Sequence, residues 1–255
     1  MRVVEYLRGR QLPSGLIENE GVSAWSVIAL GAAGYNPQTA RDGNGPSLLR
    51  ALAGYKPVSA TDYARQTLAV IAAGEDPSHY AGRDLVGGLW DFVRGNQIGE
   101  DYLLNDDVFG LLALVAAGGD VSNDRLEAVA LNILSHQHPD GGFSFEADAE
   151  EPDVDDTAAA VQALLFAKGR GMGLDLRLAM LAAESYLRRA QNSDGGFPYQ
   201  RDAFDGFSNT ASTSWAVQAF LALGIDPESV VSGGSDPLGY LAGLQNDDGS
   251  FGWAG

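Results

Sequence analysis

The chain has 255 residues, 45% hydrophobic and 20% charged, so it is long enough to bury a sizeable core and lacks the composition of a disordered protein. Asp and Glu number 34 against 16 Lys and Arg, a net charge of −18, which repels nucleic acids and excludes them as expected partners. The absence of cysteine excludes disulfides, thiolate metal sites and cysteine nucleophiles.

In chain order, two kinds of helix are expected to alternate. Their apolar residues recur with the 3.6-residue period of a helix, and no strand pattern is found. Helices of the first kind are amphipathic, and they are expected within residues 3–10, 46–56, 84–96, 126–136, 181–190 and 237–244. Helices of the second kind are rich in small residues and end in Ala-x-Gly or a close variant, and they are expected within residues 23–34, 63–74, 107–118, 157–169 and 213–224.

A turn motif, Gln-x-x-Asp-Gly-(Gly/Ser)-Phe, follows several helices of the first kind. It occurs at 137–143, 191–197 and 245–251, with a degenerate copy at 11–16. Asp-Gly supplies the positive φ that ends a helix sharply. The Phe is expected to pack over the helix end, and the Gln to satisfy exposed backbone groups there. Small residues in the second kind of helix permit close contacts between helices.

This alternation resembles the prenyltransferase/squalene-oxidase repeat superfamily over essentially the whole chain. The resemblance implies an all-α fold, a single α/α toroid covering residues 1–255. Six helices of the first kind and five of the second are counted, whereas a closed toroid of this kind has six of each. The last inner helix is therefore expected to be missing, as in a domain excised from a longer protein; a toroid that stays open or closes with the N-terminal segment is the alternative.

An acidic segment precedes the fourth helix of the second kind, where "EEPDVDD" places five carboxylates in positions 150–156. Alignment of the five helices puts Asp156 level with Asp62 and Asp106. Asp156 is therefore expected to be an N-cap, since a carboxylate accepts hydrogen bonds from free helix amides. One cap needs one carboxylate, so Asp155 is less fully explained by capping.

The stretch "GGFSFEADAEEPDVDDTAAAVQAL" resembles the catalytic segment of squalene–hopene cyclases, which carry Asp-x-Asp-Asp-Thr-Ala after a Gly-Gly-Phe turn. The resemblance places Asp153, Asp155 and Asp156 on that motif, with Asp155 in the position of the proton donor. Protonation of an alkene needs a carboxyl group that stays neutral until it reacts, and crowded, buried carboxylates have raised pKa values. The aromatic side chains expected to line the cavity are Trp25, Tyr63, Phe109 and Trp215.

Two functions remain open from the sequence. The one favoured is a non-catalytic secreted or cell-surface repeat domain that binds a protein or a hydrophobic small molecule at the toroid mouth. This interpretation rests on a likeness of "AGEDPSHYAGRDLVGGLW" and "NTASTSWAVQAFLALGIDP" to bacterial and archaeal surface-type repeat proteins. The alternative is a class II terpene-cyclase-like enzyme with Asp155 as general acid.

The remaining expectations concern ions and location. No cofactor is required, but Ca²⁺ or Mg²⁺ could bind the acidic segment, with Asp148, Glu150, Glu151 and Asp153 as oxygen ligands.

No apolar run approaches the length that spans a bilayer, and "MRVVEYLRGR" lacks the apolar stretch of a signal peptide. An extracellular or surface location after loss of such a peptide is favoured, and a cytoplasmic one stays open.

Overall fold

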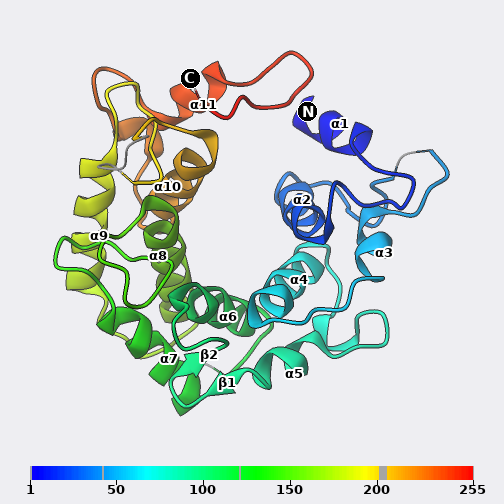
Figure 1. Ribbon diagram of the computed structural model, residues 1–255, viewed down its shortest axis with the longest axis horizontal. Helices are drawn as coiled ribbons and strands as arrows, with labels where there is room; N and C mark the ends of the chain where they lie inside the picture. The colour runs from blue at the N-terminus through cyan, green and yellow to red at the C-terminus, as the bar shows by residue number, and fades with distance from the viewer. Residues whose placement is uncertain (1, 42, 121, 201–205, 255) are drawn as a thin grey trace. The chain divides into compact units, whose positions relative to one another are not determined.

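The computed structural model describes residues 2–41, 43–120, 122–200 and 206–254. Its helices and strands, labelled in Figure 1, are α1 (Arg2–Gly9), α2 (Glu20–Ala32), α3 (Leu48–Leu52), α4 (Ala60–Ala72), η1 (Pro77–His79), α5 (Leu85–Trp90), β1 (Val93–Arg94), β2 (Gln97–Ile98), α6 (Leu104–Ala116), α7 (Asp124–Ser135), α8 (Val154–Gly169), α9 (Arg177–Ala190), α10 (Thr210–Ala222), η2 (Pro227–Ser229) and α11 (Pro237–Gly243). Within the described ranges, no helix is both long and apolar enough to cross a bilayer.

The alternation of two kinds of helix is confirmed. The small-residue helices are α2, α4, α6, α8 and α10, and the amphipathic helices alternate with them. One expectation was wrong, because β1 and β2 form a two-stranded hairpin where no strand was predicted. Its two-residue loop begins with Gly95 at φ 64°, a geometry that matches the twist of a tight hairpin.

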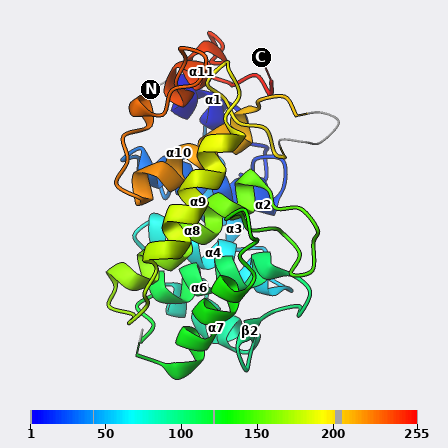
Figure 2. The ribbon, with the colours of Figure 1, turned by 90° about the vertical axis from the view of Figure 1, so that its left-hand side faces the viewer.

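The chain divides into two compact units. Unit 1 comprises Met1–Arg94, Ala113–Gly119 and Asp247–Ser250, and unit 2 comprises Gly95–Leu112, Asp120–Asn246 and Phe251–Gly255. In unit 1, α2 and α4 lie side by side, while α3 packs on α2 and α5 on α4 (Figure 1). In unit 2, α8 and α10 are neighbours, with α9 on α8 and α11 on α10 (Figure 2).

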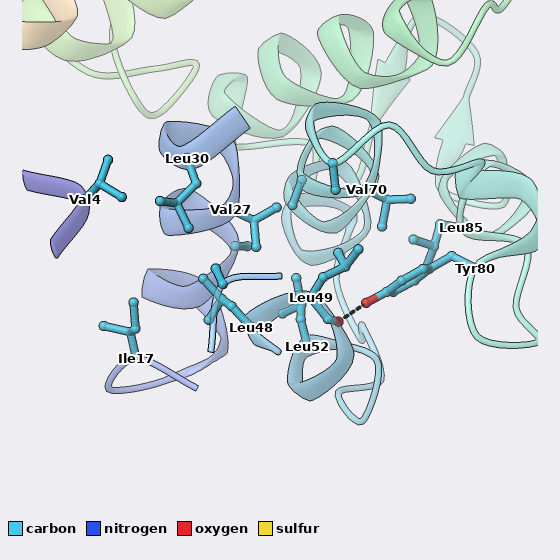
Figure 3. Packing of buried hydrophobic residues seen from close by; sticks show 14 residues of the cluster. Val4, Ile17, Val27, Leu30, Leu48, Leu49, Leu52, Val70, Tyr80 and Leu85 are labelled. Carbon is cyan, nitrogen blue, oxygen red and sulfur yellow. Dashed lines mark hydrogen bonds between the residues drawn. The ribbon is translucent and has the colours of Figure 1, made fainter. Parts of the chain in front are cut away.

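Small residues let the paired helices approach closely, as the sequence predicted. A Cβ atom on Gly31 of α2 would lie 2.4 Å from the carbonyl oxygen of Ala72 in α4, so only glycine fits there. Between these helices and α3 lies an apolar core in which the side chains of Val27, Leu30 and Leu48 are almost fully buried (Figure 3). Burial of such side chains stabilises the fold by about 1.5–3 kcal/mol each.

The turn motif joins successive repeats through its glutamine. Gln137 Nε2 donates to the carbonyl oxygen of Gly141 in its own turn (2.9 Å) and to that of Ala179 in α9 (2.8 Å). Gly141 has φ 99°, which confirms the positive φ expected at the Asp-Gly step. Phe143, which ends the motif, is fully buried. The glutamine thus satisfies backbone carbonyls, as expected, and also links one repeat to the next.

Candidate active site

Asp153 is the N-cap of α8. Its Oδ1 accepts a hydrogen bond from the backbone N–H of Asp156 at 2.7 Å, and its backbone is extended. Asn19 caps α2 and Asn209 caps α10 in the same way. The expectation that Asp156 is the cap was wrong, because the capping position lies three residues earlier, where the chain is still extended. Capping therefore explains Asp153 and leaves Asp155 and Asp156 to be explained.

The second oxygen of Asp153 contacts the next repeat. Tyr199 donates its hydroxyl to Asp153 Oδ2 at 3.1 Å, and its backbone carbonyl accepts from the N–H of Val154 at 2.9 Å. Burial raises the pKa of Asp153, while the Asp156 amide and the Tyr199 hydroxyl oppose that rise. Burial and the nearby Asp153 carboxylate raise the pKa of Tyr199, so the phenol keeps the proton that it donates.

Asp156 is buried beside Asp153 and is the more basic of the two carboxyl groups. Burial, followed by the negative charge of Asp153, raises the pKa of Asp156 to about 8. Asp153 receives two hydrogen bonds that stabilise its ionised form, so it carries the charge of the pair and Asp156 holds the proton at neutral pH.

Asp155 differs from Asp153 and Asp156 in its hydrogen bonding. Its Oδ1 is inaccessible to solvent and has no hydrogen-bond partner within the described part of the chain. Burial raises the pKa of Asp155 to about 6; the Ser212 hydroxyl of α10 opposes this rise, and the charge of Asp153 adds to it. Asn209 Nδ2 donates to Ser212 Oγ at 3.1 Å, which leaves the Ser212 hydroxyl hydrogen free to point elsewhere. The carboxyl of Asp155 can hold a proton that no neighbouring acceptor takes.

Thr157, the residue after the three aspartates, has a structural partner in the turn motif. Its Oγ1 accepts from the backbone N–H of Phe143 at 2.8 Å. Thr213 in α10 accepts in the same way from Phe197 at 2.9 Å. This position of the repeat therefore fixes the turn on the small-residue helix.

Asp107 of α6 occupies that same position, and sequence reasoning did not single it out. Its Oδ1 accepts from the N–H of Ile98 at 2.5 Å, and its Oδ2 from Asn132 Nδ2 at 3.0 Å. Burial raises the pKa of Asp107 to about 7. Alignment with the Thr157 position was the signal that could have identified Asp107 as a structural residue.

The aromatic residues expected to line a cavity are distributed over both units. In unit 2, the rings of Phe109 and Trp215 meet edge to face, with centroids 5.9 Å apart. In unit 1, Trp25 is partly exposed, while Tyr63 packs against Phe92, with ring centroids 5.7 Å apart. These contacts make Tyr63 part of the packing around α5, and they give no support to a cavity-lining role for it.

A second set of aromatic side chains was missed by sequence reasoning. Phe145, Tyr199 and Trp253 each lie two residues after the Phe of a turn motif, and all three are exposed by 42% or more. Their backbone carbonyls accept hydrogen bonds at 2.9–3.2 Å from amides at the starts of α6, α8 and α10, namely those of Asn105, Val154 and Thr210. The repeat thus places one exposed aromatic residue at the start of each of these helices.

The acidic segment shows no arrangement for an ion. In the ranges that the structure describes, no three His, Asp or Glu side chains are grouped as a metal site requires. Asp148, Glu150 and Glu151 are exposed, and both oxygens of Asp153 accept hydrogen bonds. Binding of Ca²⁺ or Mg²⁺ to these residues stays a prediction.

No protein-family model matches the chain. The drimenyl diphosphate synthase of Streptomyces showdoensis is 28% identical over 240 residues, which cover 90% of this chain and 41% of that protein. The drimenyl diphosphate synthase of Streptantibioticus cattleyicolor is 42% identical over 71 residues, 28% of this chain and 13% of that protein. The chain thus spans less than half the length of these curated relatives.

Two solved structures are similar in fold. An ent-copalyl diphosphate synthase from Streptomyces platensis matches 83% of this chain and 41% of its own, with a TM-score of 0.58 and 19% identity. A variant of the type II terpene cyclase MstE from Scytonema, in complex with merosterolic acid A, matches 98% of this chain and 80% of its own, with a TM-score of 0.63 and 13% identity. This likeness confirms the predicted fold class, all-α of the α/α toroid kind.

The same comparisons bear on the two functions that the sequence left open. Both curated relatives are drimenyl diphosphate synthases by name, and neither is a surface repeat protein. The findings therefore favour the cyclase alternative over the non-catalytic surface domain that the sequence analysis preferred. They give no support to a protein partner.

Proposed function

We propose that this chain carries the acid of a class II terpene-cyclase reaction, in which Asp155 protonates an alkene of a linear polyprenyl substrate. The observation that carries this proposal is the state of Asp155. Its Oδ1 is buried and without a hydrogen-bond partner among the described residues, and burial raises its pKa to about 6. A carboxyl group in this state is a stronger proton donor to a substrate than one already bound to a protein acceptor.

The proton balance of the reaction is simple. The alkene π pair forms a C–H bond with the Asp155 proton, the Asp155 O–H bond breaks, and the positive charge remains on the more substituted carbon. Attack by further alkenes of the same chain forms ring C–C bonds and moves the charge along the substrate. Loss of a proton from carbon then ends the sequence, so the product is an isomer of the substrate. Asp155 afterwards regains a proton from solvent.

The two neighbouring aspartates support this role electrostatically. Asp153 is held ionised by the Asp156 amide and the Tyr199 hydroxyl, and its charge raises the pKa of Asp155. The same charge supports protonation of Asp156. The charge of Asp153 thus raises the pKa of both neighbouring carboxyl groups, which increases the fraction of Asp155 that is protonated and able to donate to an alkene.

Aromatic rings supply the other requirement of this chemistry, stabilisation of a carbocation without water. Phe109 and Trp215 meet edge to face, and Trp215 lies one helical turn beyond Ser212, whose hydroxyl acts on Asp155. A cation over an aromatic face is stabilised by about 0.5–2 kcal/mol, more when it is desolvated. We assign these two rings to the carbocation in unit 2.

The relatives support a polyprenyl substrate, with one qualification about its head group. Their names point to diphosphate products, whereas a net charge of −18 on this chain disfavours an anionic substrate. Because Asp155 protonates the alkene at one end of the substrate, the mechanism does not require a particular head group at the other end. A panel of linear polyprenyl diphosphates and the corresponding alcohols therefore tests the reaction and its preference for the head group together.

The decisive experiment incubates the purified chain with this panel in D₂O and analyses the products by mass spectrometry after dephosphorylation. Cyclisation started by an acid places one deuterium in the cyclic product. Asp155→Asn should abolish that product while the far-ultraviolet circular dichroism stays unchanged, since general acids contribute about 10²–10⁴-fold to rate. Asp148→Asn, which changes an exposed carboxylate of the same segment, is the matched control and should retain activity. Undiminished product in Asp155→Asn would remove the proposed acid.

A further inference from the structure

We propose that unit 1 contains a small-molecule site of its own, formed by other residues than the three aspartates of unit 2, that binds a phosphate or diphosphate group. The site is a cavity of about 740 Å³ lined by residues 38, 41, 44–47, 49, 50, 53, 75 and 79–81, of which 49 and 50 belong to α3. Its volume lies within the range of about 300–1,000 Å³ that is usual for small-molecule sites. This inference is independent of the proposed function, because no residue of the cavity takes part in it.

The walls of the cavity are held together by contacts between separate segments. Leu48 N–H donates to the Ala40 carbonyl at 2.9 Å, which fixes the preceding loop on α3. The Tyr80 hydroxyl donates to the Leu49 carbonyl and joins residues 79–81 to α3 (Figure 3). Gln38 Nε2 donates to Glu75 Oε1 at 2.5 Å and joins the loop before α3 to the loop after α4. The cavity is therefore a formed feature of unit 1.

Two arginines line this cavity from different segments of the chain. Arg41 comes from the loop and Arg50 from α3, and both are exposed. Neither has a carboxylate within ion-pair distance among the described residues. Carboxylates outnumber Lys and Arg by 34 to 16 in this chain, whereas the lining of this cavity has two arginines and one carboxylate, Glu75. Two arginines without an ion-pair partner among the described residues are available to an anion that comes from outside the protein.

The chemistry of the lining specifies the anion further. Arginine binds phosphate oxygens through paired N–H donors, which no other side chain offers in the same planar geometry. The buried side chains of Leu49 and Tyr80 supply an apolar floor for the rest of the ligand. Glu75, the one carboxylate among the lining residues, repels an anion and accepts from a ligand hydroxyl. We therefore expect a phosphorylated small molecule with a hydroxyl group, of which inorganic pyrophosphate is the minimal probe.

Titration calorimetry of the full chain with inorganic pyrophosphate at constant ionic strength tests the site. We expect saturable binding, and we expect Arg41→Gln and Arg50→Gln each to weaken it about tenfold or more, because each removes a charge-assisted pair of hydrogen bonds. Arg177→Gln, which removes an exposed arginine of α9 in unit 2, should leave the affinity unchanged. Asp155→Asn should also bind normally, which separates this site from the proposed acid.

A fifth variant gives the experiment a result of opposite sign. Glu75→Gln removes the repelling charge but keeps an amide oxygen for Gln38, so it should bind pyrophosphate more tightly than the unchanged chain. Unfolding curves for every variant establish that the fold is intact. The proposal is overturned if neither the unchanged chain nor Glu75→Gln shows saturable heat at millimolar pyrophosphate. It is equally overturned if Arg177→Gln weakens binding as much as Arg50→Gln does.

Discussion

Tyr199 and Asp153 lie 46 positions apart in the sequence, yet the tyrosine hydroxyl donates to Asp153 Oδ2 at 3.1 Å. The contact joins the turn of one repeat to the start of the small-residue helix of the preceding repeat. Asp153 in turn caps α8 and sets the charge that Asp155 and Asp156 experience. The acidity of the candidate catalytic group thus depends on a residue of the following repeat.

Removal of this hydroxyl in Tyr199→Phe should shift the pH dependence of cyclisation. Without the donor, ionised Asp153 is less stable, so Asp153 carries less charge at neutral pH and the pKa of Asp155 falls. The loss of activity with rising pH should then begin at a lower pH, as measured from pH–rate profiles. Tyr186→Phe is the control, since Tyr186 donates to the backbone carbonyl of Pro152 and, among the described residues, to no carboxylate. Identical profiles for the Tyr199→Phe variant and the unchanged chain would contradict the coupling.

Substitutions of Asp153 can separate its capping role from its charge. Asparagine caps α2 and α10 at the equivalent position, so Asp153→Asn should keep the cap, whereas Asp153→Ala should lose it. Both changes remove the same charge. We expect the alanine variant to unfold with a free energy about 1 kcal/mol lower than that of the asparagine variant, as denaturant titration would show. Equal free energies would mean that the cap contributes nothing to stability.

Asp107 should make stability depend on pH. A carboxyl group whose pKa rises on folding binds more protons in the folded than in the unfolded state between the two pKa values. Its stabilising protonation is complete at low pH and is lost as pH rises through the folded value, here about 7. The free energy of unfolding should therefore fall between about pH 4 and pH 7, with a slope of at most about 1.4 kcal/mol per pH unit.

Asp107→Thr introduces the residue found at this position in α8 and α10, which keeps an acceptor for the Ile98 amide and removes the titrating group. The pH dependence of its unfolding free energy should be flatter than that of the unchanged chain. Asp148→Asn alters an exposed carboxylate and should leave the dependence as it is. A slope that persists in Asp107→Thr would assign the effect to other carboxyl groups, Asp156 first among them.

The predicted binding of Ca²⁺ or Mg²⁺ at the acidic segment would require the exposed carboxylates to rearrange, so we expect these ions to change the melting temperature little. Asp153 uses both oxygens for hydrogen bonds, and Asp148, Glu150 and Glu151 are exposed and ungrouped, so the described residues hold no preformed oxygen cage. Thermal unfolding with millimolar Ca²⁺ or Mg²⁺ measures this directly. A large rise in melting temperature that a chelator reverses would instead show the ion site that the acidic sequence predicted.

Local chemistry explains why so much of the architecture was readable from the sequence. The 3.6-residue period identified both kinds of helix, and the Gln-x-x-Asp-Gly motif predicted the positive φ of Gly141 and the role of Gln137. These features depend on residues within a few positions of one another. The Asp-x-Asp-Asp-Thr string likewise indicated the cyclase interpretation, which the comparisons favour over the surface domain preferred from sequence alone.

Only the tertiary structure decided which aspartate does what. It made Asp153 the cap and left Asp155 Oδ1 buried without a partner among the described residues. It also brought Tyr199 to Asp153, and Arg41 and Arg50 to one cavity. The pKa of a carboxyl group depends on burial and on neighbours within a few ångströms, and those neighbours come from other repeats. Spacing along the chain determines a helix and its turn, but the protonation of a site follows from how the helices pack.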